Sequence, residues 1–231
     1  MKTIGLIGGM SWESTLLYYQ QLNEGIKQQL GGLHSAKIVL YSVDFAEIEQ
    51  YQSSGQWDLA ARCLADAGDR LKLAGADFLV LCTNTMHKVA PRIESQTGLP
   101  LLHIADATGE LIIQSGIKKI GLLGTAFTME QPFYKQRLID NFNLNVLIPS
   151  EKDRKIVHDI IYNELCLGKI NDESRKEYQR IMASLVESGA EGIILGCTEI
   201  TLLVNQNDTT VDIFDTTAIH AQKAVELALS V

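Results

Sequence analysis

Short apolar runs alternate with longer amphipathic stretches along most of this chain. Eight runs of four to seven residues have the character of buried β-strands, at residues 3–7, 37–43, 77–81, 101–104, 119–123, 145–148, 192–195 and 211–214. Between them, apolar residues recur at helical spacing in longer stretches, at residues 15–30, 59–73, 133–142, 153–167 and 173–187. This alternation predicts an α/β fold with mostly parallel sheets.

The chain also contains an internal repeat. Residues 2–8 read KTIGLIG and residues 118–124 read KKIGLLG, at an offset of 116 positions. Residues 75–85, GADFLVLCTNT, match residues 189–199, GAEGIILGCTE, at an offset of 114 positions. A repeat of this length indicates that one α/β unit occurs twice.

We therefore predict two pseudo-symmetric, Rossmann-like domains with mostly parallel sheets. The first comprises residues 1–105 together with a C-terminal helix at residues 216–230, and the second comprises residues 106–214. Ligands of open parallel sheets bind outside the carboxyl ends of the strands. If the two halves face each other, the active site lies in the cleft between them.

Composition excludes several classes of protein. Of 231 residues, 46% are hydrophobic and 21% are charged, which is typical of a soluble globular protein. The net charge of −8, without a basic stripe, argues against nucleic acid and anionic membranes as partners. No segment has the pattern of a signal peptide or a membrane span. The cysteines are scattered, as expected for reduced thiols in a cytoplasmic protein, at Cys63, Cys82, Cys166 and Cys197.

Small polar residues follow four of the predicted strands. These strand exits read GGMS at residues 8–11, TNT at residues 83–85, GTAFT at residues 124–128 and CTE at residues 197–199. Each precedes a predicted helix, so hydroxyl and backbone N–H groups there favour a small anion. Ser, Thr and Asn at a helix start are often only N-caps, and this remains the simpler interpretation of any single loop.

The candidate thiols and imidazoles differ in their settings. Cys63 and Cys166 lie within helical patterns and are interpreted as core residues, whereas Cys82 is left open. Cys197 follows a strand at a predicted helix N-terminus, a setting that lowers the pKa of a thiol. His87 and His103 receive no catalytic assignment. The sequence has no CxxC or HExxH motif for a metal and lacks the GxGxxG spacing of a dinucleotide site.

Three motifs together resemble a known family. The segments IGLIGGMSWEST, TNTMH and LGCTEI are similar to those of the cofactor-independent aspartate/glutamate racemases, and most of all to the bacterial L-aspartate/glutamate-specific subgroup. The resemblance covers the whole chain. It implies two pseudo-symmetric α/β domains with one catalytic thiol from each, no pyridoxal phosphate and no metal. It also implies a small amino acid as substrate and a homodimer as the usual assembly.

The sequence departs from the family at the first catalytic position. The family motif is C-N-T, and here Thr83 stands in the place of the thiol while Cys82 is one residue early. A shift of one residue on a strand turns the side chain to the opposite face, so Cys82 is not expected to substitute. The resemblance assigns proton abstraction from the L enantiomer to Cys197 and proton donation to Thr83. Two groups are needed because racemisation removes the Cα proton from one face and returns it on the other.

Further substrate-binding positions follow from the resemblance and the strand exits together: Met10, Gln52, Asn84, Thr85, Thr125, Thr198 and Glu199. Members that act on acidic substrates commonly have an arginine in the loop near Gln52. A glutamine binds a carboxylate less strongly than an arginine does. Three alternatives therefore stay open, namely a broad-specificity amino-acid racemase, hydantoin racemisation or maleate isomerisation, and a degenerate protein that only binds an amino acid.

Overall fold

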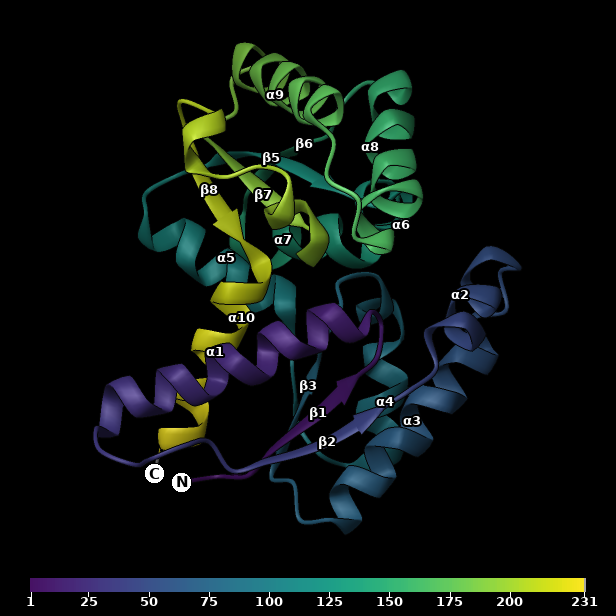
Figure 1. Ribbon diagram of the computed structural model, residues 1–231, viewed down its shortest axis with the longest axis vertical. Coiled ribbons are helices and arrows are strands. Elements are labelled where there is room, and N and C mark those ends of the chain that lie inside the picture. Colours follow the sequence, from purple (N-terminus) through teal and green to yellow (C-terminus); the bar gives the residue numbers. More distant parts are fainter. Residues whose placement is uncertain (231) are drawn as a thin grey trace. The chain divides into compact units, whose positions relative to one another are not determined.

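The computed structural model describes residues 1–230, which divide into two compact units. The first unit comprises Met1–Ile104 and the C-terminal segment from His220, and the second comprises Ala105–Ile219. The C-terminal helix α10, Thr216–Leu229, begins in the second unit and ends in the first (Figure 1). Its last turns join the first unit's core, and the N–H of Lys2 donates to the carbonyl of Ala228 at 2.8 Å.

The first unit is built on a parallel four-stranded sheet in the order β2-β1-β3-β4. Its strands are β1 (Ile4–Gly8), β2 (Ile38–Ser42), β3 (Phe78–Leu81) and β4 (Leu101–Leu102). Its helices are α1 (Trp12–Leu30), α2 (Phe45–Ser53), α3 (Trp57–Leu73), the 3₁₀ helix η1 (Thr85–Val89) and α4 (Ala90–Thr97).

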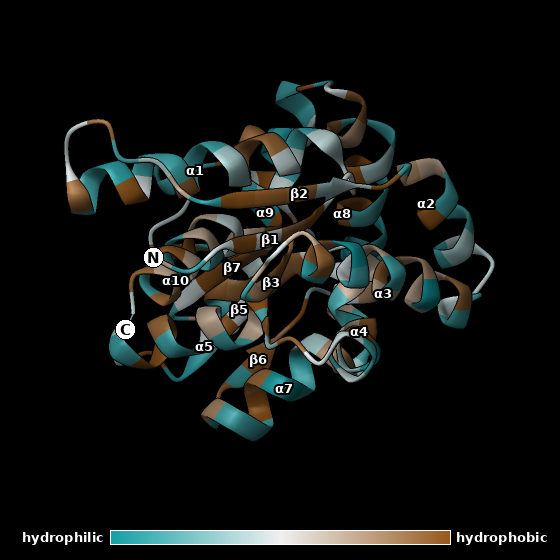
Figure 2. Cartoon of the chain, turned by 90° about the horizontal axis from the view of Figure 1, so that it is seen from below, coloured by the Kyte–Doolittle hydropathy of each residue, from teal (hydrophilic) through white to brown (hydrophobic). Residues whose placement is uncertain are grey.

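Alternating side chains of β1 and β3 form two cores on opposite faces of this sheet. Ile4, Leu6 and Val80 pack against α1 and α10, whereas Ile7 and Leu79 pack against α3 and α4. The central strands are apolar on both faces, as Figure 2 shows, because helices cover both sides of the sheet.

The second unit repeats the plan with the strand order β6-β5-β7-β8, again all parallel. Its strands are β5 (Lys119–Gly124), β6 (Asn145–Leu147), β7 (Gly192–Gly196) and β8 (Asp212–Asp215). Its helices are α5 (Ile104–Gln114), α6 (Ala126–Glu130), α7 (Pro132–Phe142), α8 (Glu151–Asn163) and α9 (Asp172–Glu187), with 3₁₀ turns η2 (Leu165–Leu167), η3 (Thr198–Leu202) and η4 (Gln206–Asp208).

The structure confirms the predicted α/β class and the pair of equivalent parallel sheets. The predicted helix at residues 153–167 was too long, because α8 ends at Asn163 and the chain continues as η2. Glu164, with φ of −126°, leaves the helical conformation there. The helices that begin at Thr85 and Thr198 are short 3₁₀ helices, so their N-termini carry a weaker dipole than an α-helix would. In the described residues, no helix is both long and apolar enough to cross a membrane.

Candidate active site

The four polar strand exits follow the two central strands of each sheet. β1 and β3 are neighbours in register through Ile7 and Leu81, so the exits at residues 8–11 and 83–85 lie side by side. β5 and β7 pair through Gly124 and Gly196, which brings together the exits at residues 124–128 and 197–199. Each unit therefore carries one pair of adjacent loops at the carboxyl edge of its sheet.

The exit of β1 is fixed by glycine and by Thr15. Gly9 has φ of +94°, and a Cβ there would collide with the carbonyl oxygen of Val43. Its N–H donates to the Thr15 hydroxyl at 2.8 Å, and that hydroxyl donates to the carbonyl of Ser11 at 2.9 Å. Ser11 caps α1. Met10, between Gly9 and Ser11 in the chain, is buried and belongs to the core that contains Met86.

The exit of β3 separates Cys82 from Thr83. Cys82 is fully buried in the core with Phe78 and Val80, and this burial raises the pKa of its thiol. Thr83 is partly exposed, whereas the next two predicted binding residues, Asn84 and Thr85, are buried. The expectation that Cys82 faces away from Thr83's side of the sheet fits this packing, so the structure assigns Cys82 to the core.

His87 holds the carbonyl of Thr83 in place. Its Nδ1 lies 2.8 Å from the Thr83 oxygen, and its Nε2 accepts the N–H of Ile104 at 3.2 Å. A carbonyl can only accept, so Nδ1 must carry the proton and the imidazole must be neutral. Burial, with further contributions from His103 and His220, lowers the pKa of His87 well below its usual value.

His87 belongs to a group of three imidazoles behind this exit. Its ring centroid lies 4.6 Å from that of His103 and 5.6 Å from that of His220. His220 donates from Nε2 to the carbonyl of Leu102 at 2.8 Å, and its Nδ1 accepts the hydroxyl of Tyr18 at 2.8 Å. Burial lowers the pKa of His220 to about 4. His87 and His220 are therefore neutral, each in a fixed tautomer. No sequence pattern indicates this group, because His220 comes from the distant C-terminal helix α10.

The sequence predicted that Gln52 lies in a loop, at the position that commonly carries an arginine in the family. The structure shows otherwise. Helix α2 occupies this part of the chain, and Gln52 is buried in its last turn. Its amide Nε2 lies 2.9 Å from the Sδ of Met86 in η1. Gln52 thus contacts the segment that carries Thr85, although it reaches that segment from a helix.

In the second unit, Cys197 donates a hydrogen bond from Sγ to the Oε2 of Glu199 at 2.9 Å. The pKa of its thiol lies well above the ordinary value, chiefly because of burial and then because of the charge of Glu199, with a smaller contribution from Cys166. The prediction of a lowered pKa was therefore wrong in direction. Desolvation and a neighbouring carboxylate outweigh the weak dipole of the short η3 helix.

Two threonines at the start of α10 support the exit of β7. Thr217 donates from its hydroxyl to that of Thr198 at 3.0 Å, and Thr216 donates to the carbonyl of Leu195 at 2.9 Å. Thr198 and Glu199 are both buried. The supporting threonines come from a segment that the sequence alone did not connect with this loop.

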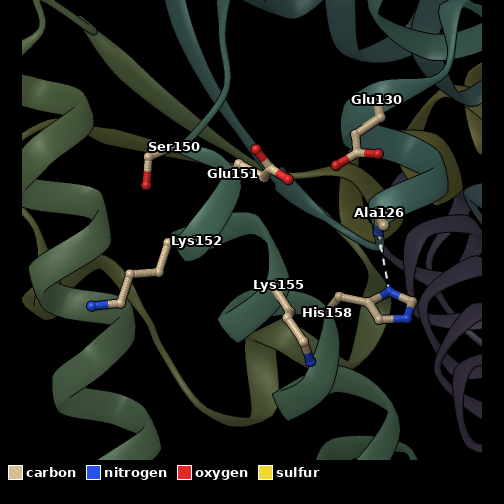
Figure 3. Close-up of a pocket in the computed structure, with 7 residues that line it drawn as sticks. All are labelled: Ala126, Glu130, Ser150, Glu151, Lys152, Lys155 and His158. Carbon is tan, nitrogen blue, oxygen red and sulfur yellow. Dashed lines mark hydrogen bonds between the residues drawn. The ribbon is translucent and has the colours of Figure 1, made fainter.

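Thr125 caps α6, since its hydroxyl accepts the N–H of Thr128 at 3.3 Å. The N–H of the next residue, Ala126, donates to the Nδ1 of His158 at 3.2 Å, and burial lowers the pKa of that imidazole. Ala126 and His158 line a pocket of about 710 Å³ at this edge of the second sheet (Figure 3). Two acidic and two basic side chains also line this pocket: Glu130, Glu151, Lys152 and Lys155.

Within residues 1–230, no three His, Cys, Asp or Glu side chains are grouped so as to hold a metal ion. The polar groups at the four exits are hydroxyl, amide, thiol and carboxylate groups. Within each unit, groups of these kinds can bind a carboxylate and exchange protons.

Comparison with known proteins decides the family. Residues 7–224 match the family described as Asp/Glu/hydantoin racemase. The chain belongs to this family. It is accordingly an isomerase, a racemase of the Asp/Glu racemase family.

Two crystal structures and one curated protein are similar along their whole lengths. A Yersinia pestis protein, provisionally named an Asp/Glu racemase, is 60% identical, with 100% of both chains covered and a TM-score of 0.94. An aspartate racemase homologue from Pyrococcus horikoshii OT3 is 34% identical, with 100% of both chains covered and a TM-score of 0.86. The broad specificity amino-acid racemase RacX of Bacillus subtilis (strain 168) is 22% identical, with 98% of each chain covered.

Proposed function

We propose that this racemase interconverts the enantiomers of aspartate or glutamate, with Cys197 removing the Cα proton of the L enantiomer and Thr83 protonating the opposite face. One observation carries the proposal. Thr83 and Cys197 are the partly exposed residues that follow β3 and β7, the equivalent central strands of the two sheets. The duplicated fold thus provides one candidate acid/base group from each unit.

The proposed cycle begins at Cys197, which must lose its proton before it can act as a base. Glu199 is the proposed acceptor, because its carboxylate already accepts the S–H bond at 2.9 Å. The thiolate then takes the Cα proton, and the electron pair of the C–H bond passes into the substrate carboxylate as an enediolate. Hydroxyl and N–H donors at the strand exits stabilise this charge.

Thr83 completes the turnover by proton donation. Its hydroxyl gives a proton to the other face of the planar intermediate, directly or through a water molecule. Cys197 now carries the Cα proton, so Glu199 releases to solvent the proton that it took from Cys197, and solvent returns one proton to Thr83. A threonine hydroxyl is a poor base, so we expect the reaction to begin less readily from the D enantiomer. The equilibrium constant is one, however, so kcat/KM must be equal in both directions. An apparent preference can therefore arise only from different saturation or inhibition.

A broad-specificity amino-acid racemase is the second candidate function. The observation in its favour is the neutral side chain of Gln52, which cannot form an ion pair with an acidic substrate. The similarity to RacX, whose name states broad specificity, supports the same alternative. The third candidate, a protein that binds an amino acid without turnover, differs from both because it predicts binding without proton exchange.

The decisive experiment is α-proton exchange in D₂O, followed by NMR. The substrates are both enantiomers of aspartate and glutamate, with several neutral amino acids for comparison. The enzymes are the wild type, Cys197→Ala, Thr83→Cys and the matched control Cys63→Ala, which removes a thiol from α3. We expect exchange of the L acidic substrates, its loss in Cys197→Ala, no loss in Cys63→Ala, and faster use of the D enantiomer in Thr83→Cys.

Other outcomes select other functions. Exchange of neutral amino acids at comparable rates favours the broad-specificity racemase. Calorimetric binding without any exchange, together with exchange in Thr83→Cys, favours the binding protein. Full activity of Cys197→Ala would contradict the proposed mechanism.

A further inference from the structure

A second pocket, of about 500 Å³, lies in the first unit and is separate from the residues proposed for catalysis. The first turns of α3 and α4 and the end of η1 line it, with Trp57, Arg62, Lys88 and Arg92 among the lining side chains. Helices α3 and α4 pack directly against each other, as both views of the fold show (Figures 1 and 2). The pocket is therefore built from segments that are far apart in the chain but firmly joined in the fold.

The charge of this pocket is opposite to that of the whole chain. The protein has a net charge of −8, yet three basic side chains line this pocket against the single carboxylate of Asp58. Neither Arg62 nor Arg92 forms an ion pair in the part of the chain that the structure describes. By contrast, Arg137, Arg154, Arg175 and Arg180 are all paired with carboxylates, and the guanidinium of Arg70 lies 5.5 Å from the ring centroid of Tyr41.

Lys88 is held in position within the pocket. Its ammonium group lies 3.7 Å from the ring centroid of Trp57, a cation–π contact that orients the side chain. Partial burial lowers the pKa of Lys88. A bound anion would offset that loss of hydration, so the site gains from occupancy by negative charge.

The residue types indicate the class of ligand. Two guanidinium groups and one ammonium group offer planar forks and a point charge, which suit phosphate and carboxylate oxygens. Exposed charge pairs are individually weak, so a singly charged ion would bind poorly and several charges on one ligand are required. We propose that this pocket is a binding site for a small, multiply charged oxyanion, either phosphoryl or polycarboxylate.

The pocket and the exit of β3 share the short helix η1. Lys88 and His87 are neighbours in η1, and this short helix begins at Thr85. An oxyanion bound to Lys88 thus contacts η1 one residue after His87, which holds the carbonyl of Thr83. Binding itself does not depend on the proposed racemase chemistry and can be measured without any substrate.

The test is isothermal titration calorimetry of the full chain with sodium pyrophosphate and, separately, with citrate, at low and at high ionic strength. We expect saturable binding of at least one of these ions that weakens as salt is raised. Arg62→Ala and Arg92→Ala should each raise Kd about tenfold, since hydrogen bonds between charged groups contribute on that order. The tighter of the two ions identifies the phosphoryl or the carboxylate class.

Arg70→Ala is the matched control, because it removes one positive charge from the same helix α3 outside the pocket. Its Kd should equal that of the wild type, and all three variants should retain the circular dichroism spectrum and the exchange rate of the wild type. The proposal is overturned if neither ion binds, or if Arg70→Ala weakens binding as much as Arg62→Ala. It is also overturned if Arg62→Ala abolishes α-proton exchange, because the pocket would then be part of the substrate site.

Discussion

At the scale of single residues, hydrogen bonds decide which polar groups can take part in chemistry. Thr83 and Cys197 are both partly exposed at strand ends, but they differ in their partners. The backbone of Thr83 is clamped by a neutral imidazole, whereas the thiol of Cys197 is bonded to a carboxylate. These two contacts make separate predictions.

His87 is predicted to position Thr83 through its Nδ1 proton. His87→Asn places an amide N–H near the former Nδ1, whereas His87→Gln places its amide near the former Nε2. We therefore expect kcat to fall about tenfold or more in His87→Gln and less in His87→Asn, with little change in KM, since one lost positioning contact has an effect of this order. Steady-state α-proton exchange measures both values. Equal losses in the two variants would indicate a purely structural role.

Before substrate binds, Glu199 is predicted to keep Cys197 protonated, although the same carboxylate is the proposed acceptor of that proton during turnover. Its charge and its hydrogen bond to the thiol both raise the pKa of Cys197, so Glu199→Gln should lower that pKa and increase the thiolate fraction near neutral pH. The rate of iodoacetamide alkylation as a function of pH measures the change. Alkylation of the other cysteines is measured in the Cys197→Ala counterpart of each protein and subtracted. An alkylation profile that moves to higher pH would contradict this explanation.

At the scale of elements, the exits of the central strands are positioned by turns that require particular residues. β1 leaves its sheet through Gly9, which has a positive φ and no room for a Cβ. The exit of β7 is supported instead by threonines at the start of α10. The exits of β1 and β7, which are not equivalent strands, therefore depend on different local contacts.

Gly9→Ala is predicted to destabilise the protein by about 3 kcal/mol, because a positive φ and a steric collision act together. Gly75→Ala is the matched control. Gly75 has φ of +92°, close to the +94° of Gly9, but no atom lies within 4 Å of the position that a Cβ would occupy there. Gly75→Ala should lower the free energy of unfolding by only about 1–2 kcal/mol, which is the effect of the positive φ without a steric collision. Urea denaturation measures both, and equal losses would show that the collision with Val43 is relieved without cost.

At the scale of the whole molecule, each unit has its own sheet, and the C-terminal helix joins the core of the first. His220 on α10 bonds to Tyr18 of α1 and to the backbone carbonyl of Leu102 in β4. A buried neutral histidine thus connects three segments that are distant in the sequence. This arrangement makes the stability of the first unit depend on pH.

Stability is predicted to fall as the pH drops from about 6.5 toward 4. The pKa of His220 is lowered from 6.5 to about 4 in the folded protein, so the unfolded chain binds more protons in this window. The contribution is complete above the unfolded pKa and lost as the pH approaches the folded one. Its loss amounts to about 3 kcal/mol. His87, whose pKa is also lowered, acts in the same direction.

Urea denaturation across this pH range measures the effect. His220→Asn should reduce the slope of stability against pH, whereas the exposed His34→Asn should leave it unchanged. A slope that is the same in His220→Asn and in the wild type would show that other groups control the acid sensitivity.

The sequence by itself determined the α/β class, the duplication and the strand exits, because apolar periodicity and the internal repeat are local patterns. It also separated Cys82 from Thr83, since alternation along a strand depends only on neighbouring residues. Only the tertiary structure decided that Gln52 lies in a helix against Met86, that burial and Glu199 raise the pKa of Cys197, and that three histidines meet behind Thr83. Desolvation and contacts between distant segments depend on how the chain packs, and no local pattern encodes them.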